Sequence, residues 1–132
     1  MNLAGVLAPI PTPFDRERRV DPARLRAALA RWLKTPLAGF VVLGSTGEAV
    51  LLDEDESDRV IAAARETIPS DRSLLIGTGR ESTQAAVRAT RRAADLGADA
   101  VLVRTPGFYK TQMTGDGFVG HYTAVADASP VP

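Results

Sequence analysis

The stretch from Gly39 to Ala49, GFVVLGSTGEA, decides the fold of this chain. Its first five residues are a continuous apolar run, which predicts a strand buried on both faces. A turn with two hydroxyl side chains between two glycines follows, and an amphipathic helical pattern begins at Asp53. Strand, turn and helix together form one βα unit.

The turn is itself a candidate binding site. Ser45 and Thr46 bring two hydroxyls and several backbone amides into one small space, and the flanking Gly44 and Gly47 permit close approach of a ligand. Such a turn can hold a carboxylate or a phosphate. A plainer interpretation stays open, in which the same residues only link the strand to the helix.

Three further apolar runs resemble the first, and helical patterns separate them. The runs cover residues 5–10, 73–76 and 100–103. The first helical pattern begins after Asp21 as an N-cap and ends before Pro36, and the second covers residues 53–68. The third follows Ser82 as an N-cap and stops at Gly97, and the fourth covers residues 114–128. We expect an inward stripe on the fourth helix made of Phe118, Val119, Tyr122, Val125 and Ala126.

These elements predict an α/β fold of four consecutive βα units in a single domain, residues 1–132. The four strands can form a small open doubly wound sheet or the first half of an eight-stranded barrel. Residues 129–132 have the composition of an approach to a fifth strand. In both closures the loops after the strands lie at one edge of the sheet, where ligands bind.

Two other loops at this edge carry candidate residues. The first strand leads into PIPTPF, residues 9–14, which can bring Thr12 to the site, although its three prolines can equally be architectural. The fourth strand leads into TPGFYK, residues 105–110, which carries Tyr109. A phenol there can transfer a proton, or the aromatic pair can act as a lid or a subunit contact.

Composition excludes several classes of function. Sixteen basic residues balance sixteen acidic ones, which argues against a nucleic-acid partner, and no apolar run has the roughly 18 to 20 residues of a membrane span. The chain has no cysteine and no secretory signal at its start, so we expect a cytoplasmic protein. The single histidine, His121, has no second ligand at helical spacing, and we predict neither a metal nor a cofactor.

Three motifs in order resemble a known family. Residues 11–14 (PTPF), 44–48 (GSTGE) and 105–109 (TPGFY) are similar to the corresponding segments of the dihydrodipicolinate synthase and N-acetylneuraminate lyase family. Its members are class I aldolases that use or release pyruvate and are built on an eight-stranded barrel. The resemblance covers the whole chain as an N-terminal half, and residues 121–132 look closest to the 4-hydroxy-2-oxoglutarate aldolase branch.

The resemblance implies a role for each matched residue. Ser45 and Thr46, with the amide of Gly47, would hold the carboxylate of a 2-oxo acid, and the hydroxyl of Ser45 would join a proton relay. Tyr109 would reach into the relay of a neighbouring subunit of a homo-oligomer. The family's Schiff-base lysine and a second relay tyrosine would follow Pro132. Phe108 replaces a tyrosine that is common in the family, and Arg104 replaces an apolar residue.

Three hypotheses follow for the function. The first is a Schiff-base lyase or synthase acting on pyruvate or another 2-oxo acid, of which this chain is the half without the imine lysine. The chain alone is then expected to be inactive, because its two lysines, Lys34 and Lys110, do not lie on strands. The second is a non-catalytic half barrel that assembles with itself or with a complementary half. The third is a small domain that binds an anion at residues 44–47.

Overall fold

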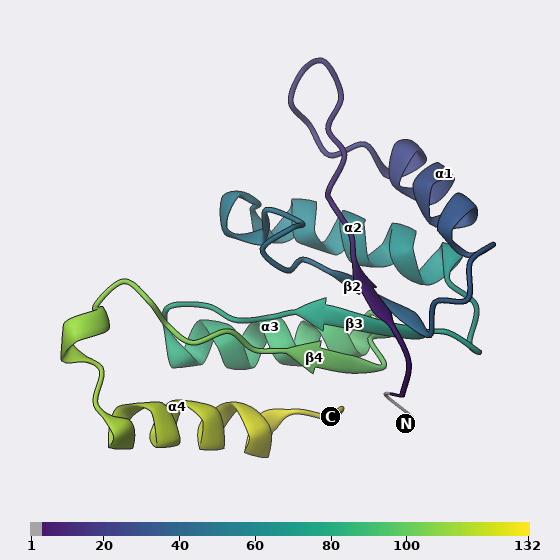
Figure 1. Ribbon diagram of the computed structural model, residues 1–132. Coiled ribbons are helices and arrows are strands. Elements are labelled where there is room, and N and C mark those ends of the chain that lie inside the picture. Colours follow the sequence, from purple (N-terminus) through teal and green to yellow (C-terminus); the bar gives the residue numbers. More distant parts are fainter. Residues whose placement is uncertain (1–3) are drawn as a thin grey trace.

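Four parallel strands form one sheet in the computed structural model, which describes residues 4–132 (Figure 1). The strands are β1 (Leu7–Pro9), β2 (Gly39–Val42), β3 (Ser73–Gly77) and β4 (Ala100–Leu102), and their order is β1-β2-β3-β4. A doubly wound sheet reverses its strand order at a switch point. Here each strand pairs with the next one in sequence, so the winding is that of half a βα barrel. The predicted fold class is confirmed.

A helix follows each strand. These are α1 (Pro22–Trp32), α2 (Glu54–Thr67), α3 (Thr83–Asp95) and α4 (Gly115–Ala128), with short 3-10 helices η1 (Ala49–Leu51) and η2 (Lys110–Gln112) in the loops. Side-chain caps begin the helices. Asp21 accepts from the amide of Arg24, as the sequence predicts, and Asp53 forms a capping box with Glu56 where the sequence indicated only an acidic start. Helix α1 packs on α2, and α3 packs on α4.

The core lies between the sheet and the helices. Phe40 and Val42 of β2 stand beside Leu74 and Ile76 of β3, and all four side chains are fully buried. Burial of each such side chain contributes about 1.5–3 kcal/mol. On the opposite face of the sheet Val41 is half-buried and Leu102 is 50% exposed. Leu75 and Ala100 on that face are buried, so the predicted burial is met fully on the side that the helices cover and in part on the other.

Helix α4 corrects part of the sequence prediction. Its predicted bounds hold, but Val119 is 66% exposed and Ala126 is also exposed, whereas His121 and Val125 are the buried residues. The imidazole Nδ1 of His121 lies 2.9 Å from the hydroxyl of Thr83 on α3. The packed side of α4 is therefore formed by His121 and Val125 with the half-buried Phe118 and Tyr122, and it excludes Val119 and Ala126.

The outer edge of β4 is partly covered by the last residues of the chain. The amide of Val101 donates to the carbonyl of Pro132 at 2.9 Å, so residues 129–132 approach the sheet where a fifth parallel strand would lie. Strand β1 is shorter than the predicted run of residues 5–10. Within residues 4–132, no helix combines the length and the apolar character needed to cross a membrane.

Candidate active site

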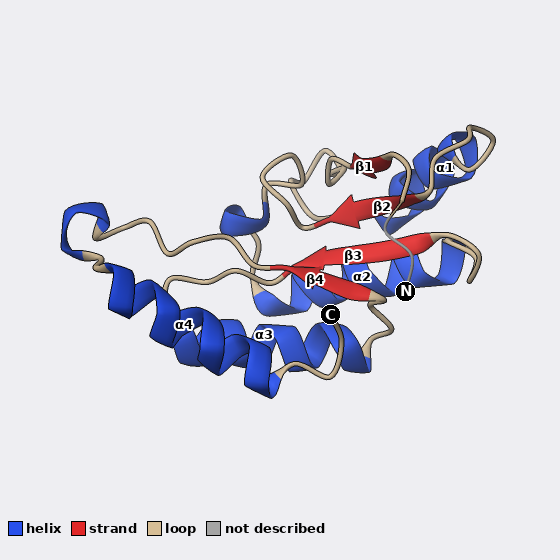
Figure 2. Ribbon diagram, turned by 60° about the horizontal axis from the view of Figure 1, so that its bottom comes forward, coloured by secondary structure: helices blue, strands red, loops and turns tan. Residues whose placement is uncertain are grey.

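The loops that follow the four strands gather at one edge of the sheet, where the strand arrowheads point in Figure 2. This edge carries the hydroxyl turn after β2, the loop after β3 and the long loop between β4 and α4. Parallel pairing brings the carboxyl ends of the strands together, so residues far apart in sequence become neighbours there.

The hydroxyl turn, residues 44–48, leaves four hydrogen-bond donors free. The amide of Gly47 donates to the carbonyl of Gly44 and that of Glu48 to the carbonyl of Ser45, each at 3.1 Å. Among the described residues, neither the amides nor the hydroxyls of Ser45 and Thr46 have a protein partner. Both residues are exposed. Two hydroxyls and two amides are therefore available to an anion.

The backbone at both ends of the turn is left-handed. Leu43 has φ 56° and Glu48 has φ 54°, values that a side chain other than glycine adopts rarely. The conformation at Leu43 presses its carbonyl against Gly77 at the end of β3, where a β carbon would lie 1.9 Å from that oxygen. The absence of a side chain at residue 77 thus lets the turn lie directly on β3.

Thr12 supports the turn from the loop after β1. Its side chain is 5% exposed, and its hydroxyl donates to the carbonyl of Gly47 at 2.7 Å. Thr12 therefore lies at the predicted edge, but its hydroxyl is already bound to the turn. The amide of Gly47 is also bound, to the carbonyl of Gly44. Direct contact of either residue with a substrate stays a prediction.

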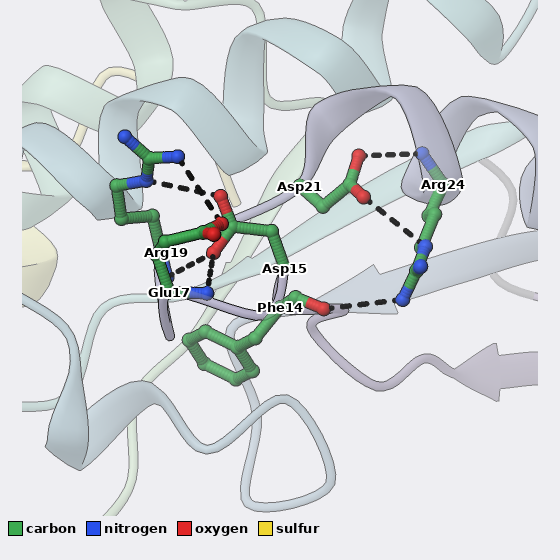
Figure 3. A network of polar contacts seen from close by, with 6 residues as sticks. All are labelled: Phe14, Asp15, Glu17, Arg19, Asp21 and Arg24. Carbon is green, nitrogen blue, oxygen red and sulfur yellow. Dashed lines mark hydrogen bonds and ion pairs between the residues drawn. The ribbon is translucent and has the colours of Figure 1, made fainter.

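The segment that carries Thr12 is held by a polar network (Figure 3). The carboxylate of Asp15 accepts from the amides of Glu17 and Arg19, each at 2.9 Å, and pairs with the guanidinium of Arg19 at 3.0 Å. The hydrogen bond from the amide of Arg19 lowers the pKa of Asp15 most strongly. These contacts close the loop, and the guanidinium of Arg24 donates to the carbonyl of Phe14, which ties the loop to α1.

A cavity of about 320 Å³ opens beside the turn. Ser45 lines it from the turn, Arg80 and Glu81 from the loop after β3, and Leu102 and Arg104 from the end of β4. The guanidinium of Arg80 is partly buried, and this burial lowers its pKa. Sequence reasoning did not single out Arg80 or Glu81, since neither belongs to a recognisable motif.

Tyr109 lies on the same edge but outside this cavity. Its ring packs edge-on against Phe108 with centroids 4.9 Å apart, and the two side chains are 64% and 78% exposed. Within one chain the structure does not bring the phenol into contact with Ser45. An exposed aromatic pair at this position is available to a neighbouring molecule.

Comparisons with known proteins decide the family. The model of the dihydrodipicolinate synthetase family matches residues 2–132. The chain belongs to this family. It is 39% identical over 132 residues to a 4-hydroxy-tetrahydrodipicolinate synthase of Stenotrophomonas maltophilia, covering 100% of this chain and 44% of that one. The crystal structure of a dihydrodipicolinate synthase from Bacillus anthracis is similar with a TM-score of 0.91 and 27% identity, over 100% of this chain and 45% of the other.

The aldolase branch is also represented among the relatives. The chain is 37% identical over 132 residues to a protein of Emericella nidulans named "Probable 4-hydroxy-2-oxoglutarate aldolase, mitochondrial", covering 97% of this chain and 43% of that one. The resemblance derived from the three motifs is therefore confirmed at the level of the family. The chain spans less than half the length of these two relatives.

Neither lysine of this family member lies on a strand. Lys34 follows α1 and Lys110 begins η2, and both are exposed. A Schiff-base lysine needs an environment that lowers its pKa, such as burial or a neighbouring cation. No cluster of three or more His, Cys, Asp or Glu side chains that could hold a metal occurs within residues 4–132.

Proposed function

We propose that the protein containing this chain is a Schiff-base lyase or synthase that makes or breaks a carbon–carbon bond in pyruvate or a related 2-oxo acid. The observation that carries the proposal is the set of free donors on Ser45 and Thr46 at the carboxyl end of β2. Family membership supplies the chemistry: the relatives are named as synthases and aldolases.

In the proposed complex the substrate carboxylate accepts hydrogen bonds from the hydroxyls and amides of Ser45 and Thr46. This fixes the adjacent carbonyl carbon in front of an amine, and imine formation there releases one water molecule. The hydroxyl of Ser45 also passes a proton between the reacting oxygen and the phenol of Tyr109. Thr12 holds the turn in position through Gly47, so its contribution is to geometry.

We assign the imine lysine to a part of the protein outside this chain. Lys34 and Lys110 are exposed, and neither faces the cavity beside the turn. A second copy of the protein is the proposed partner of the Phe108 and Tyr109 pair, because the rings are exposed and Tyr109 does not reach Ser45 within one chain. A cytoplasmic location fits a chain without cysteine.

Borohydride trapping tests the proposal. The intact gene product incubated with pyruvate and borohydride should gain the mass of a reduced pyruvyl adduct, and the 132-residue chain alone should not. Ser45→Ala should slow trapping about 10- to 1000-fold, in line with loss of one preorganised donor. Ser70→Ala is the matched control, since Ser70 is an exposed serine in the loop between α2 and β3. Absence of any adduct on the gene product, or an adduct on Lys110, would overturn the proposal.

A non-catalytic assembly module is the second candidate. Strand β1 pairs only with β2 within the described residues, and the helix-free face of the sheet is partly exposed, so assembly would cover unsatisfied edges. Sedimentation of the 132-residue chain distinguishes this case: a stable dimer of the chain supports it, and a monomer with a cooperative thermal transition contradicts it.

A further inference from the structure

One carboxylate joins the loop after β3 to the loop that carries Tyr109. Glu81 precedes α3, and its Oε2 accepts from the amides of Gly107 and Phe108, each at 2.9 Å. Its Oε1 lies 2.8 Å from a guanidinium nitrogen of Arg104. Both oxygens of one side chain are therefore engaged by the segment 104–108, which ends in the first ring of the aromatic pair.

Arg104 is itself fixed against the loop after β3. A β carbon on Gly79 would lie 2.5 Å from Cγ of Arg104 and 2.6 Å from its amide nitrogen. The backbone at Gly79 therefore packs directly against both the side chain and the backbone of Arg104. The same guanidinium donates to the carbonyl of Thr105 at 3.2 Å. Arg104, for which the family resemblance offered no explanation, thus orients the carboxylate of Glu81 and the start of the loop together.

We propose that Glu81 is a positioning residue for Tyr109, holding the loop at residues 107–108 so that the phenol is presented in one orientation. The inference rests on the proposed function, in which Tyr109 acts in the proton relay. Successive Cα atoms are only about 3.8 Å apart, so fixing the amide of Phe108 leaves Tyr109 little freedom of position. The edge-on contact between the two rings narrows that freedom further.

A competing role for Glu81 is that of a general base, because it lines the same cavity as Ser45. Hydrogen bonds from Phe108 and Gly107, together with Arg104, lower the pKa of Glu81 to about 2. A carboxylate with so low a pKa is a weak base near neutral pH, and both of its oxygens already accept donors. The arrangement suits a structural anchor rather than proton transfer.

Two measurements on the intact gene product test the anchor without relying on activity. In Glu81→Ala, amide exchange at Gly107 and Phe108 should rise about tenfold, since two charge-assisted hydrogen bonds are lost, whereas exchange in α3 should not change. In protein labelled with fluorotyrosine, the ¹⁹F signal of Tyr109, assigned through Tyr109→Phe, should shift or broaden. In Glu81→Gln, the exchange rates of Gly107 and Phe108 should lie between those of wild type and Glu81→Ala, because the side-chain amide oxygen still accepts hydrogen bonds from the loop.

The matched control is Glu66→Ala. Glu66 is an exposed glutamate that pairs with Arg26 at 2.7 Å and touches neither loop, so its removal should leave both measurements unchanged. The proposal is overturned when exchange at residues 107–108 and the Tyr109 signal are the same in Glu81→Ala and in wild type. It is also overturned when Glu66→Ala produces the same changes.

Kinetics then separate the anchor from the proposed function. Glu81→Ala should lower kcat about 10- to 100-fold, with KM for the 2-oxo acid changed less than twofold, because the carboxylate-binding turn is untouched. When the exchange and ¹⁹F changes occur and kcat stays at the wild-type value, the loop is anchored as proposed but Tyr109 has no part in the reaction. Failure of borohydride trapping in wild type counts against the proposed function alone.

Discussion

Replacing Gly77 with alanine should push the hydroxyl turn away from the end of β3. A β carbon at residue 77 would lie 1.9 Å from the carbonyl oxygen of Leu43, 2.6 Å from its carbonyl carbon and 3.1 Å from the amide of Gly44. Ordinary contact begins at 3.4 Å. The backbone of Leu43 would have to retreat by roughly 1.5 Å, and no flexible side chain is present to absorb the movement.

The loss of stability in Gly77→Ala depends on which atoms the new β carbon meets. Overpacking a buried site typically costs about 1–3 kcal/mol, and a clash with backbone belongs at the upper end, about 3 kcal/mol. For a chain of this length such a loss lowers Tm by roughly 10 °C. Ser45 follows two residues after Leu43, so the free donors should move as well, and binding of a 2-oxo acid should weaken in the same variant.

Gly44→Ala is the matched control for Gly77→Ala. A β carbon at residue 44 would meet only Cγ1 of Val41, at 3.9 Å, and Gly44 does not have a positive φ. Its free energy of unfolding should stay within about 0.5–1 kcal/mol of wild type. Urea denaturation followed by far-UV circular dichroism gives both values. Equal midpoints for the two alanine variants would refute the reasoning that β3 supports the turn by close contact.

Three further predictions concern the supports of the site. Thr12→Val should cost about 1–3 kcal/mol in urea denaturation, because the buried carbonyl of Gly47 loses its donor, whereas Thr12→Ser should retain most of the stability. The stability difference between wild type and Glu81→Ala, measured from pH 6 downwards, should be full above pH 4.5 and disappear as the pH falls through about 2, because the folded-state pKa of Glu81 is lowered from 4.5 to about 2. Arg65→Ala should lower Tm, because its guanidinium donates both to Asp99 and to backbone carbonyls at the opposite edge of the sheet, whereas Arg59→Ala should not.

Local signals in the sequence were sufficient for the elements. Continuous apolar runs predict β2 and β3 within one residue of their observed ends, because these strands are buried and short. Asp21 as an N-cap before Pro22, and the acidic residues that follow Asp53, predict helix starts through contacts within the first helical turn. Such contacts depend on neighbours in sequence, so no knowledge of the tertiary structure is needed to find them.

The orientation of α4 could not be derived in the same way. Apolar residues surround most of its circumference, and three glycines leave little contrast between its faces. Its packed side includes the contact of His121 with Thr83, two residues separated by 38 positions in the chain. Apolar periodicity does not place a histidine on the buried side of a helix, and the predicted stripe was wrong at Val119 and Ala126.

The candidate site likewise has one part that is local in sequence and another that depends on distant residues. The hydroxyl turn is local: its glycines and hydroxyls are adjacent in sequence, and a motif reveals it. The supports of the site are not local, because Thr12 reaches Gly47 across 35 positions and Glu81 reaches Gly107 across 26. In each contact the side chain meets a backbone carbonyl or amide, groups that every residue except proline possesses in full, and so no residue type marks the partner in the sequence.

Gly77, at the end of β3, and Gly79, just after it, connect the three loops at this edge of the sheet. Gly77 receives the carbonyl of Leu43 from the turn after β2, and Gly79 receives Arg104 from the loop after β4. The segment after β3 therefore touches both neighbouring loops with its backbone, and it also supplies Glu81. A side chain at either glycine would change the distance between the hydroxyl turn and the loop of Tyr109, although neither glycine lies in one of the two motifs. The geometry of the site is thus set by the residues between the two motifs, and substitution of Ser45 or Tyr109 can alter the chemistry while that geometry persists.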